Sequence, residues 1–152
     1  MHEYQASVIW VRESGPFADG RYSRNHQWQL GGGAVCRASA SPQVVPVPYS
    51  DPGAIDPEEA FVAAISSCHM LWFLDLARQA GHEAEAYHDP AVGQMSRAAD
   101  GGLWMAKVTL FPTTRWAGPG PDDRELKALH ETAHEKCYIA QSVKTEVEIR
   151  LT

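Results

Sequence analysis

One long stretch without a charged side chain, Ala60 to Leu74, constrains this sequence more than any other feature. The residues around it predict a single helix. Asp56 suits an N-cap, Pro57 suits the first helical position, and Gly81 suits a left-handed stop. A helix that is apolar on every side is usually a core helix enclosed by other elements. We therefore predict a core helix, too short and too well capped to span a bilayer, whose all-round apolar surface hints at a partner.

The composition favours a soluble globular protein. The 152 residues are most simply one domain, 1–152, with 44% hydrophobic and 21% charged residues. A formal charge of −6, with basic residues scattered singly, argues against a nucleic-acid surface. The first residues lack the pattern of a signal peptide, and three cysteines without an export signal favour a reducing compartment. We expect a cytoplasmic protein that binds neither nucleic acid nor membrane.

The hydrophobic pattern predicts an α+β fold. Alternation predicts strands at Glu3–Val11, Tyr22–Leu30 and Ala34–Ser39, and the short turns between them favour an antiparallel meander. After the apolar helix come a strand over residues 83–97, interrupted near Asp89-Pro90, a strand over 103–115, a helix over 121–137 and a strand over 143–151. The predicted order is three strands, helix, two strands, helix, strand.

Cysteines occupy two positions that attract attention. Cys68 lies in the middle of the apolar helix, and Cys137 ends the second predicted helix. Taken alone, Cys68 reads most simply as a small core hydrophobe, because free cysteine is among the most buried residue types. Cys36 has no motif around it and reads as a small strand residue.

The segments around these two cysteines together resemble the OsmC/Ohr family, in its OsmC-like branch. They are Pro57-Glu58-Glu59 followed by Ala63-Ala64 and Cys68, and Ala133-His134-Glu135 shortly before Cys137. The resemblance implies an intertwined homodimer in which antiparallel sheets wrap paired central helices. It implies a peroxidase of organic hydroperoxides, with hydrogen peroxide as a second candidate substrate. It implies no cofactor and no metal, and a dithiol reductant of dihydrolipoyl type or a small thiol.

The resemblance also implies roles for particular residues. Cys68 would be the peroxidatic nucleophile, and Cys137 the resolving thiol that closes a disulfide with it. Glu58 matches the family glutamate, directly after Pro57 and ten residues before Cys68. Ten helical residues rise about 15 Å, so Glu58 is expected to reach the Cys68 of the other subunit or to act through an arginine. Alternatively, Glu58 is only a first-turn residue that complements the helix dipole, as is Glu59.

The family arginine has no obvious counterpart. The Ohr branch carries Gly-Gly-Arg-x-Gly in its first turn, whereas this chain has Pro16-Phe17-Ala18-Asp19-Gly20. Arg24, expected to point inward from the second strand, is our choice, and an Arg24–Glu58 pair would satisfy both charges. Arg21 and Arg37 are alternatives, and Arg24 could also be a solvated strand residue.

Apolar side chains are expected to line a pocket for an organic hydroperoxide, although most could equally be core. They are Trp28, Phe61, Ile65, Met70, Trp72 and Tyr138, with His26 as a further lining residue. The Ohr branch has Cys-Pro where this chain has Cys137-Tyr138, which leaves the substrate preference open.

Two other functions compete with the peroxidase. His130, His134 and Cys137 share one helix face, and His69 neighbours Cys68, a set of side chains that zinc accepts, although the chain has no CxxC motif. A family member without turnover, binding a small apolar ligand, is the other alternative. A cysteine hydrolase using Cys68 and His69 is less favoured, because adjacent helical residues do not face each other.

Overall fold

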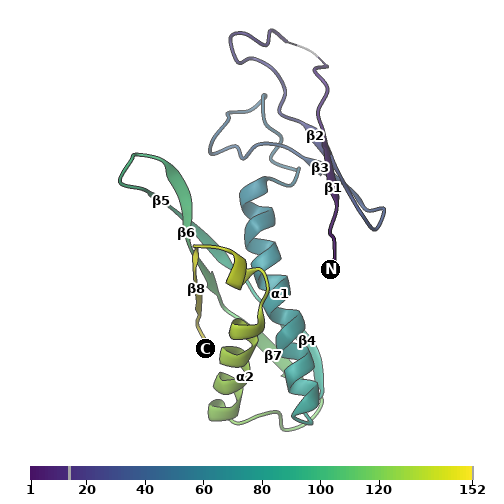
Figure 1. Cartoon of the computed structure of the whole chain (residues 1–152), viewed down its shortest axis with the longest axis vertical. Helices are drawn as coiled ribbons and strands as arrows, with labels where there is room; N and C mark the ends of the chain where they lie inside the picture. The colour runs from purple at the N-terminus through teal and green to yellow at the C-terminus, as the bar shows by residue number, and fades with distance from the viewer. Residues whose placement is uncertain (14, 152) are drawn as a thin grey trace. The chain divides into compact units, whose positions relative to one another are not determined.

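The computed structural model describes residues 1–13 and 15–151 and has an α+β architecture with two α-helices (Figure 1). The chain forms two compact units, Met1–Ala60 and Phe61–Thr152. The expectation that 1–152 acts as one domain stays a prediction.

The first unit contains a three-stranded antiparallel sheet, which confirms the predicted meander. Its strands are β1 (Ala6–Ile9), β2 (His26–Leu30) and β3 (Val35–Ala38), in the order β1-β2-β3. Val8 pairs with Trp28, and Trp28 pairs with Cys36. All of β1 is exposed in the single chain, so this edge strand has no cover of its own.

The long helix α1 (Pro57–Gln79) begins and ends where its caps predict. Asp56 is buried and accepts a hydrogen bond from the Glu59 backbone N–H at 2.8 Å, as an N-cap does. Gly81 has a φ of 87° and donates to Arg78, while His82 donates to Ala77. This pair of hydrogen bonds is the Schellman arrangement that satisfies the last carbonyl groups of a helix.

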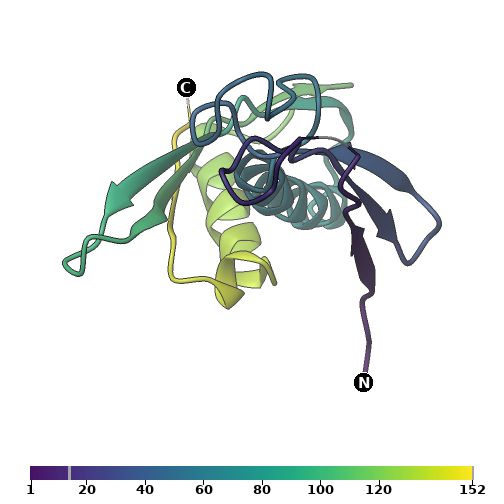
Figure 2. The same cartoon turned by 90° about the horizontal axis from the view of Figure 1, so that it is seen from above.

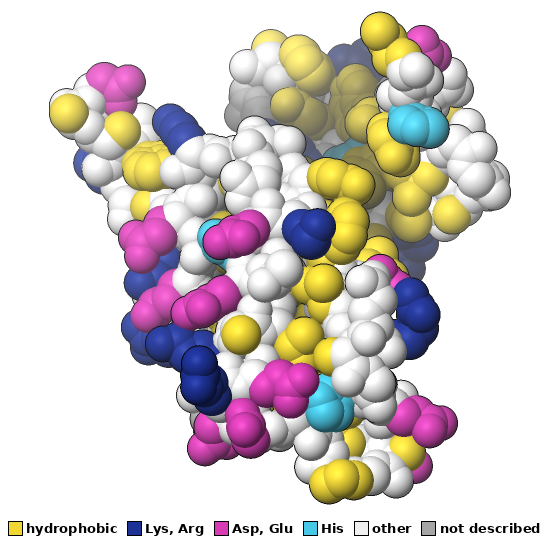
Figure 3. Space-filling view, turned by 60° about the horizontal axis from the view of Figure 1, so that its bottom comes forward, with side chains coloured by type: hydrophobic (Ala, Val, Ile, Leu, Met, Phe, Trp, Pro, Cys, Tyr) yellow, Lys and Arg dark blue, Asp and Glu magenta, His cyan; other side chains and the backbone are white. Residues whose placement is uncertain are grey.

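Only one stripe of α1 is buried in the single chain. The stripe consists of Ile65, His69, Phe73 and Ala77, one residue per turn. Leu71 keeps 65% of its surface exposed, so the expectation of a helix enclosed on all sides is wrong for the isolated chain. Figure 3 shows hydrophobic side chains reaching the surface on the face that it draws. An exposed apolar face on a long helix calls for a covering partner.

By length and composition alone, α1 could also cross a membrane. The expectation that it is too short to do so is therefore not supported by its 23 residues. The core helix of a water-soluble domain can have the same length and composition. These properties of α1 therefore do not decide between a core helix and a membrane-spanning helix.

The second unit holds two sheets and differs from the prediction in strand number. Strands β4 (Ala84–His88) and β7 (Thr113–Trp116) form one pair, and β5 (Val92–Arg97), β6 (Leu103–Leu110) and β8 (Glu146–Ile149) form a sheet in the order β5-β6-β8. Figure 2 shows the β5–β6 hairpin extending away from the helices of this unit.

Four strands, not two, therefore separate the helices. The predicted strand over 103–115 divides at Pro112, whose missing N–H interrupts a ladder, and the chain after it pairs with β4. The expected antiparallel pairing holds for β4–β7 and β5–β6, whereas β6 and β8 run parallel. The connection between these two parallel strands carries the second helix.

Helix α2 (Asp123–Lys136) is followed by a short 3₁₀ turn, η1 (Ala140–Ser142). Asp122 caps α2 by accepting from the Glu125 N–H at 2.8 Å. The core of this unit gathers Ile65 of α1 against Val108 and Leu110 of β6. This packing, together with the α2 connection, fixes the part of α1 that bears Cys68.

Candidate active site

The two cysteines singled out by the sequence lie in contact. Cys68 is half-buried on α1, and Cys137, fully buried, ends α2. Both are free thiols. Burial first, and then a hydrogen bond with the Cys68 side chain, raise the pKa of the Cys137 thiol. Two thiols that interact in this way are candidates for closing a disulfide.

The end of α2 fixes the position of Cys137. The backbone leaves the helix there, with ψ at 106°, while the Cys137 N–H still bonds to the His134 carbonyl at 3.3 Å. The chain then turns directly into η1, whose Ala140 N–H donates to the Cys137 sulfur at 3.4 Å and whose Gln141 N–H donates to the Cys137 carbonyl at 3.0 Å. The thiol is thus held between a helix end and a tight turn.

An aromatic pair and a lysine adjoin the cysteines. Trp72, one turn after Cys68, makes an edge-to-face contact with Tyr138, with ring centroids 5.5 Å apart. The Lys136 ammonium lies 5.3 Å from the centre of the Trp72 ring. Nothing in the sequence marks Lys136 as a site residue, because a lysine in the last turn of a helix is common. It is a cation directly next to Cys137 in the chain.

Arg24 lies two residues before β2 and not on a strand. Its guanidinium donates to the Gly20 and Tyr22 carbonyl oxygens and stacks on the Tyr22 ring, 3.7 Å from the ring centre. Its backbone N–H bonds to the Tyr49 carbonyl, so β2 begins only at His26. The predicted strand position of Arg24 is therefore wrong. The local acceptors that hold Arg24 could not be read from the alternation pattern.

The other candidate arginines and Glu58 are also placed within the first unit. Arg21 pairs with Asp19 at 2.6 Å, and Arg37 pairs with Asp51. Glu58 lies half-buried in the first turn of α1. Within the described part of Met1–Ala60, no ion pair joins Arg24 to Glu58. A pairing of Glu58 with a second subunit stays a prediction.

His26 and Trp28 form a small polar contact on β2. The Trp28 indole N–H donates to His26 Nε2 at 3.0 Å, and His26 Nδ1 lies 2.8 Å from the Arg24 carbonyl oxygen. Because an indole nitrogen can only donate, His26 Nε2 accepts and its Nδ1–H donates to Arg24. This fixes the tautomer of His26. Its predicted role in lining a substrate pocket stays a prediction.

The predicted lining residues of the second unit have different surroundings. Ile65 is fully buried against Val108 and Leu110, and Phe61 packs against the same cluster. Met70 is half-buried, and Tyr138 keeps 68% of its surface exposed. Ile65 and Phe61 thus contribute to the core, whereas Tyr138 and Trp72 lie where an incoming molecule could touch them.

Two histidines that the sequence offered as zinc ligands bind each other. His69 Nε2 lies 2.9 Å from His130 Nδ1, and the His130 ring stacks on Phe73 at 3.9 Å. Burial, with a smaller contribution from His134, lowers the pKa of His69 to about 4, and burial lowers that of His130 to about 3. Over residues 1–13 and 15–151, no three histidine, cysteine or acidic side chains are grouped to hold a metal ion. The zinc alternative gains no support.

Asp89 was missed as a site residue. Its carboxylate accepts from the Ser66 hydroxyl on α1 and from the Phe111 backbone N–H at 2.7 Å. It thereby ties α1, two residues before Cys68, to the end of β6. The sequence offered Asp89-Pro90 only as a break in a strand.

Comparison with known proteins identifies the family of the chain. A family model described as OsmC-like protein matches residues 50–152. The solved structure of an OsmC-like protein of unknown function from Vibrio cholerae O1 biovar eltor is 46% identical, with all of both chains covered and a TM-score of 0.96. A search of curated proteins finds no match.

More distant structures share the fold. An organic hydroperoxide resistance protein OsmC from Legionella pneumophila is 19% identical, with 99% of this chain and 96% of that chain covered and a TM-score of 0.70. The organic hydroperoxide resistance protein OhrB of Bacillus subtilis is 16% identical, with 99% and 98% covered and a TM-score of 0.71. The chain, matched by the family model over more than half its length, belongs to the OsmC-like protein family.

Proposed function

We propose that the protein is a thiol-dependent peroxidase that reduces organic hydroperoxides. The hydrogen-bond contact between the Cys68 and Cys137 thiols is the observation that carries the proposal. Membership of a family whose distant members include hydroperoxide resistance proteins supports it. Hydrogen peroxide is a second candidate substrate.

The reaction proceeds in three balanced steps. The Cys68 thiolate attacks one oxygen of the peroxide, the S–O bond forms as the O–O bond breaks, and the alkoxide leaves and takes up a proton. Cys137 then attacks the Cys68 sulfenic acid, which forms the disulfide and releases water. An external dithiol supplies two electrons and two protons to restore both thiols. We place this cycle in the cytoplasm, where such reductants are available.

The buried Cys137 thiol suits the resolving role. Its raised pKa keeps it protonated at neutral pH, so it does not compete with Cys68 for the peroxide. The Ala140 N–H that already bonds its sulfur can support the thiolate when it forms.

We propose that the active unit is a homodimer. The exposed strand β1 and the exposed side of α1, including Leu71, supply apolar surface for a second copy. In this assembly Glu58 and Arg24 approach the Cys68 of the partner, where a cation would favour the thiolate and a carboxylate would orient it. Lys136, beside Cys137, is a further source of positive charge.

A second candidate function is binding of a small apolar ligand without turnover. It is favoured by the observation that all three candidate arginines have acceptors of their own in the first unit. The exposed Tyr138 and its neighbour Trp72 would provide the contact surface.

Mass spectrometry of the reduced protein after one equivalent of cumene hydroperoxide separates the two functions. The peroxidase predicts loss of two hydrogens and a linked Cys68–Cys137 peptide, with repeated turnover when a dithiol is added. Cys68→Ser abolishes both results, whereas the matched control Cys36→Ser keeps them. A wild-type mass that does not change would overturn the peroxidase and leave the binding function.

A further inference from the structure

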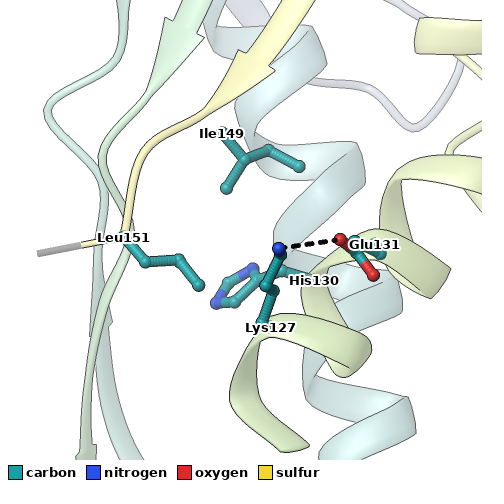
Figure 4. Close-up of a pocket in the computed structure, with 5 residues that line it drawn as sticks. All are labelled: Lys127, His130, Glu131, Ile149 and Leu151. Carbon is teal, nitrogen blue, oxygen red and sulfur yellow. Dashed lines mark ion pairs between the residues drawn. The ribbon is translucent and has the colours of Figure 1, made fainter. Parts of the chain in front are cut away.

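A small pocket lies between α2 and β8 in the second unit (Figure 4). Its volume is about 220 Å³, and its lining residues are Lys127, His130, Glu131, Ile149 and Leu151. Pockets for drug-sized ligands run to roughly 300–1,000 Å³, so this one suits a smaller molecule. His130 precedes Cys137 by seven residues, about 10 Å along the helix, and neither thiol is among the lining residues.

His130 places a buried polar group in this pocket. Its side chain is only 2% exposed, and its Nδ1 is used in the contact with His69. In the described part of the chain, the other ring nitrogen, Nε2, has no hydrogen-bond partner and is not fully enclosed. Figure 4 shows the ring reaching from α2 between Lys127 and Leu151. An unpaired ring nitrogen that a buried side chain presents to a pocket can bond a ligand there.

The tautomer of the histidine pair makes Nε2 a donor. His69 Nδ1 is buried and has no partner in the described residues. A buried N–H without an acceptor is rarer in proteins than a buried acceptor without a donor, so the proton of His69 belongs on Nε2. It then donates to His130 Nδ1, and the proton of His130 lies on Nε2, inside the pocket.

The other lining residues indicate the charge and the polarity of the ligand that the pocket can hold. Lys127 and Glu131 stand on one side with 3.8 Å between Lys127 Nζ and Glu131 Oε1, and both side chains are mostly exposed. Such a pair is weakly held, so the ammonium can turn to another acceptor at little cost. Ile149 and Leu151 form the apolar side.

We propose that this pocket binds a small monocarboxylate with a short aliphatic chain. The carboxylate accepts from His130 Nε2 and from the Lys127 ammonium, and the chain packs against Ile149 and Leu151. The site is independent of the proposed peroxidase cycle.

Ring-nitrogen NMR of the full reduced chain, titrated with sodium butyrate at constant ionic strength and neutral pH, tests the proposal. We expect a saturable shift of the His130 resonances with a Kd on the order of 1 mM, as suits a ligand of few heavy atoms. Butylamine, with the same apolar tail and the opposite charge, should give no saturable shift.

Two surface variants provide the matched comparison without disturbing the buried histidines. Lys127→Gln should weaken butyrate binding about two- to fivefold, the effect of losing one exposed charge contact. Lys144→Gln, whose ammonium lies over Trp104 and outside the pocket, should leave it unchanged. A shift that grows linearly without saturating, an equal response to butylamine, or an unchanged affinity in Lys127→Gln would overturn the proposal.

Discussion

The Cys137 thiol is hydrogen-bonded to Cys68 although the two residues lie on different helices, and this contact leads to the first prediction. In Cys137→Ser the sulfenic acid of Cys68 has no thiol to condense with. We expect one added oxygen, measured by mass spectrometry after one equivalent of hydroperoxide, and further oxidation when peroxide is in excess. A Cys137→Ser protein that still loses two hydrogens would show that another cysteine resolves Cys68.

The buried histidine pair predicts loss of stability in mild acid. Folding holds the pKa of His69 at about 4 and that of His130 at about 3, against about 6.5 unfolded. The unfolded chain therefore binds more protons between these values, and stability falls as pH falls from 6.5 towards 4, by on the order of 3 kcal/mol for each histidine. His134 and Asp89 act on His69 in opposite directions, the first lowering and the second raising its pKa.

Urea unfolding at neutral pH and in mild acid measures this dependence. His130→Gln keeps a polar group opposite His69 but does not titrate, so the pH dependence should become shallower. His2→Gln, at an exposed residue, should retain the wild-type dependence. Equal pH dependence in wild type and His130→Gln would contradict the assignment.

Asp89 predicts a stability effect on the segment that bears Cys68. Asp89→Ala leaves the Ser66 hydroxyl and the Phe111 N–H without their acceptor, which costs about 1–3 kcal/mol for each group that stays unsatisfied. Asp89→Asn keeps one acceptor oxygen and should lose less. Urea unfolding measures the stability of both variants and of the control Asp123→Ala, on the exposed start of α2. Similar losses of stability in all three variants would argue against a stabilising role of the Asp89 hydrogen bonds.

The exposed side of α1 predicts an assembly. If a second copy covers Leu71, the wild-type protein sediments at twice the 16.7 kDa chain mass. Leu71→Glu should shift it towards the monomer, because a buried unpaired carboxylate is costly. Val44→Glu, at a similarly exposed loop residue, serves as the control. A wild-type monomer at micromolar concentration would reject the assembly.

Local signals in the sequence were enough to locate the main elements. The N-cap Asp56 and the stop at Gly81 act through nearby backbone groups, so the ends of α1 were predicted correctly. The division between β6 and β7 was missed because Pro112 interrupts a run that alternates well on either side of it. The parallel β6–β8 pairing depends on contacts far apart in sequence, which alternation does not encode.

Only part of the candidate site was predicted, because several of its contacts join residues far apart in the sequence. The two cysteines came from motif spacing, and the structure places them in contact. Arg24 was misplaced because its acceptors, the Gly20 and Tyr22 carbonyl oxygens, belong to a turn whose shape the pattern does not specify. The pairing of His69 with His130 joins two helices across the second unit, and only tertiary packing brings them together.

The parallel pairing of β6 with β8 has a consequence for how the chain can move. The segment that carries Cys137 leaves one strand and returns to its neighbour in the same sheet, so both of its ends are anchored. This anchoring limits how far the segment that carries Cys137 can move away from Cys68. For the peroxidase proposed above, we therefore expect the external dithiol to reach the disulfide where α2 ends, with the sheet left intact.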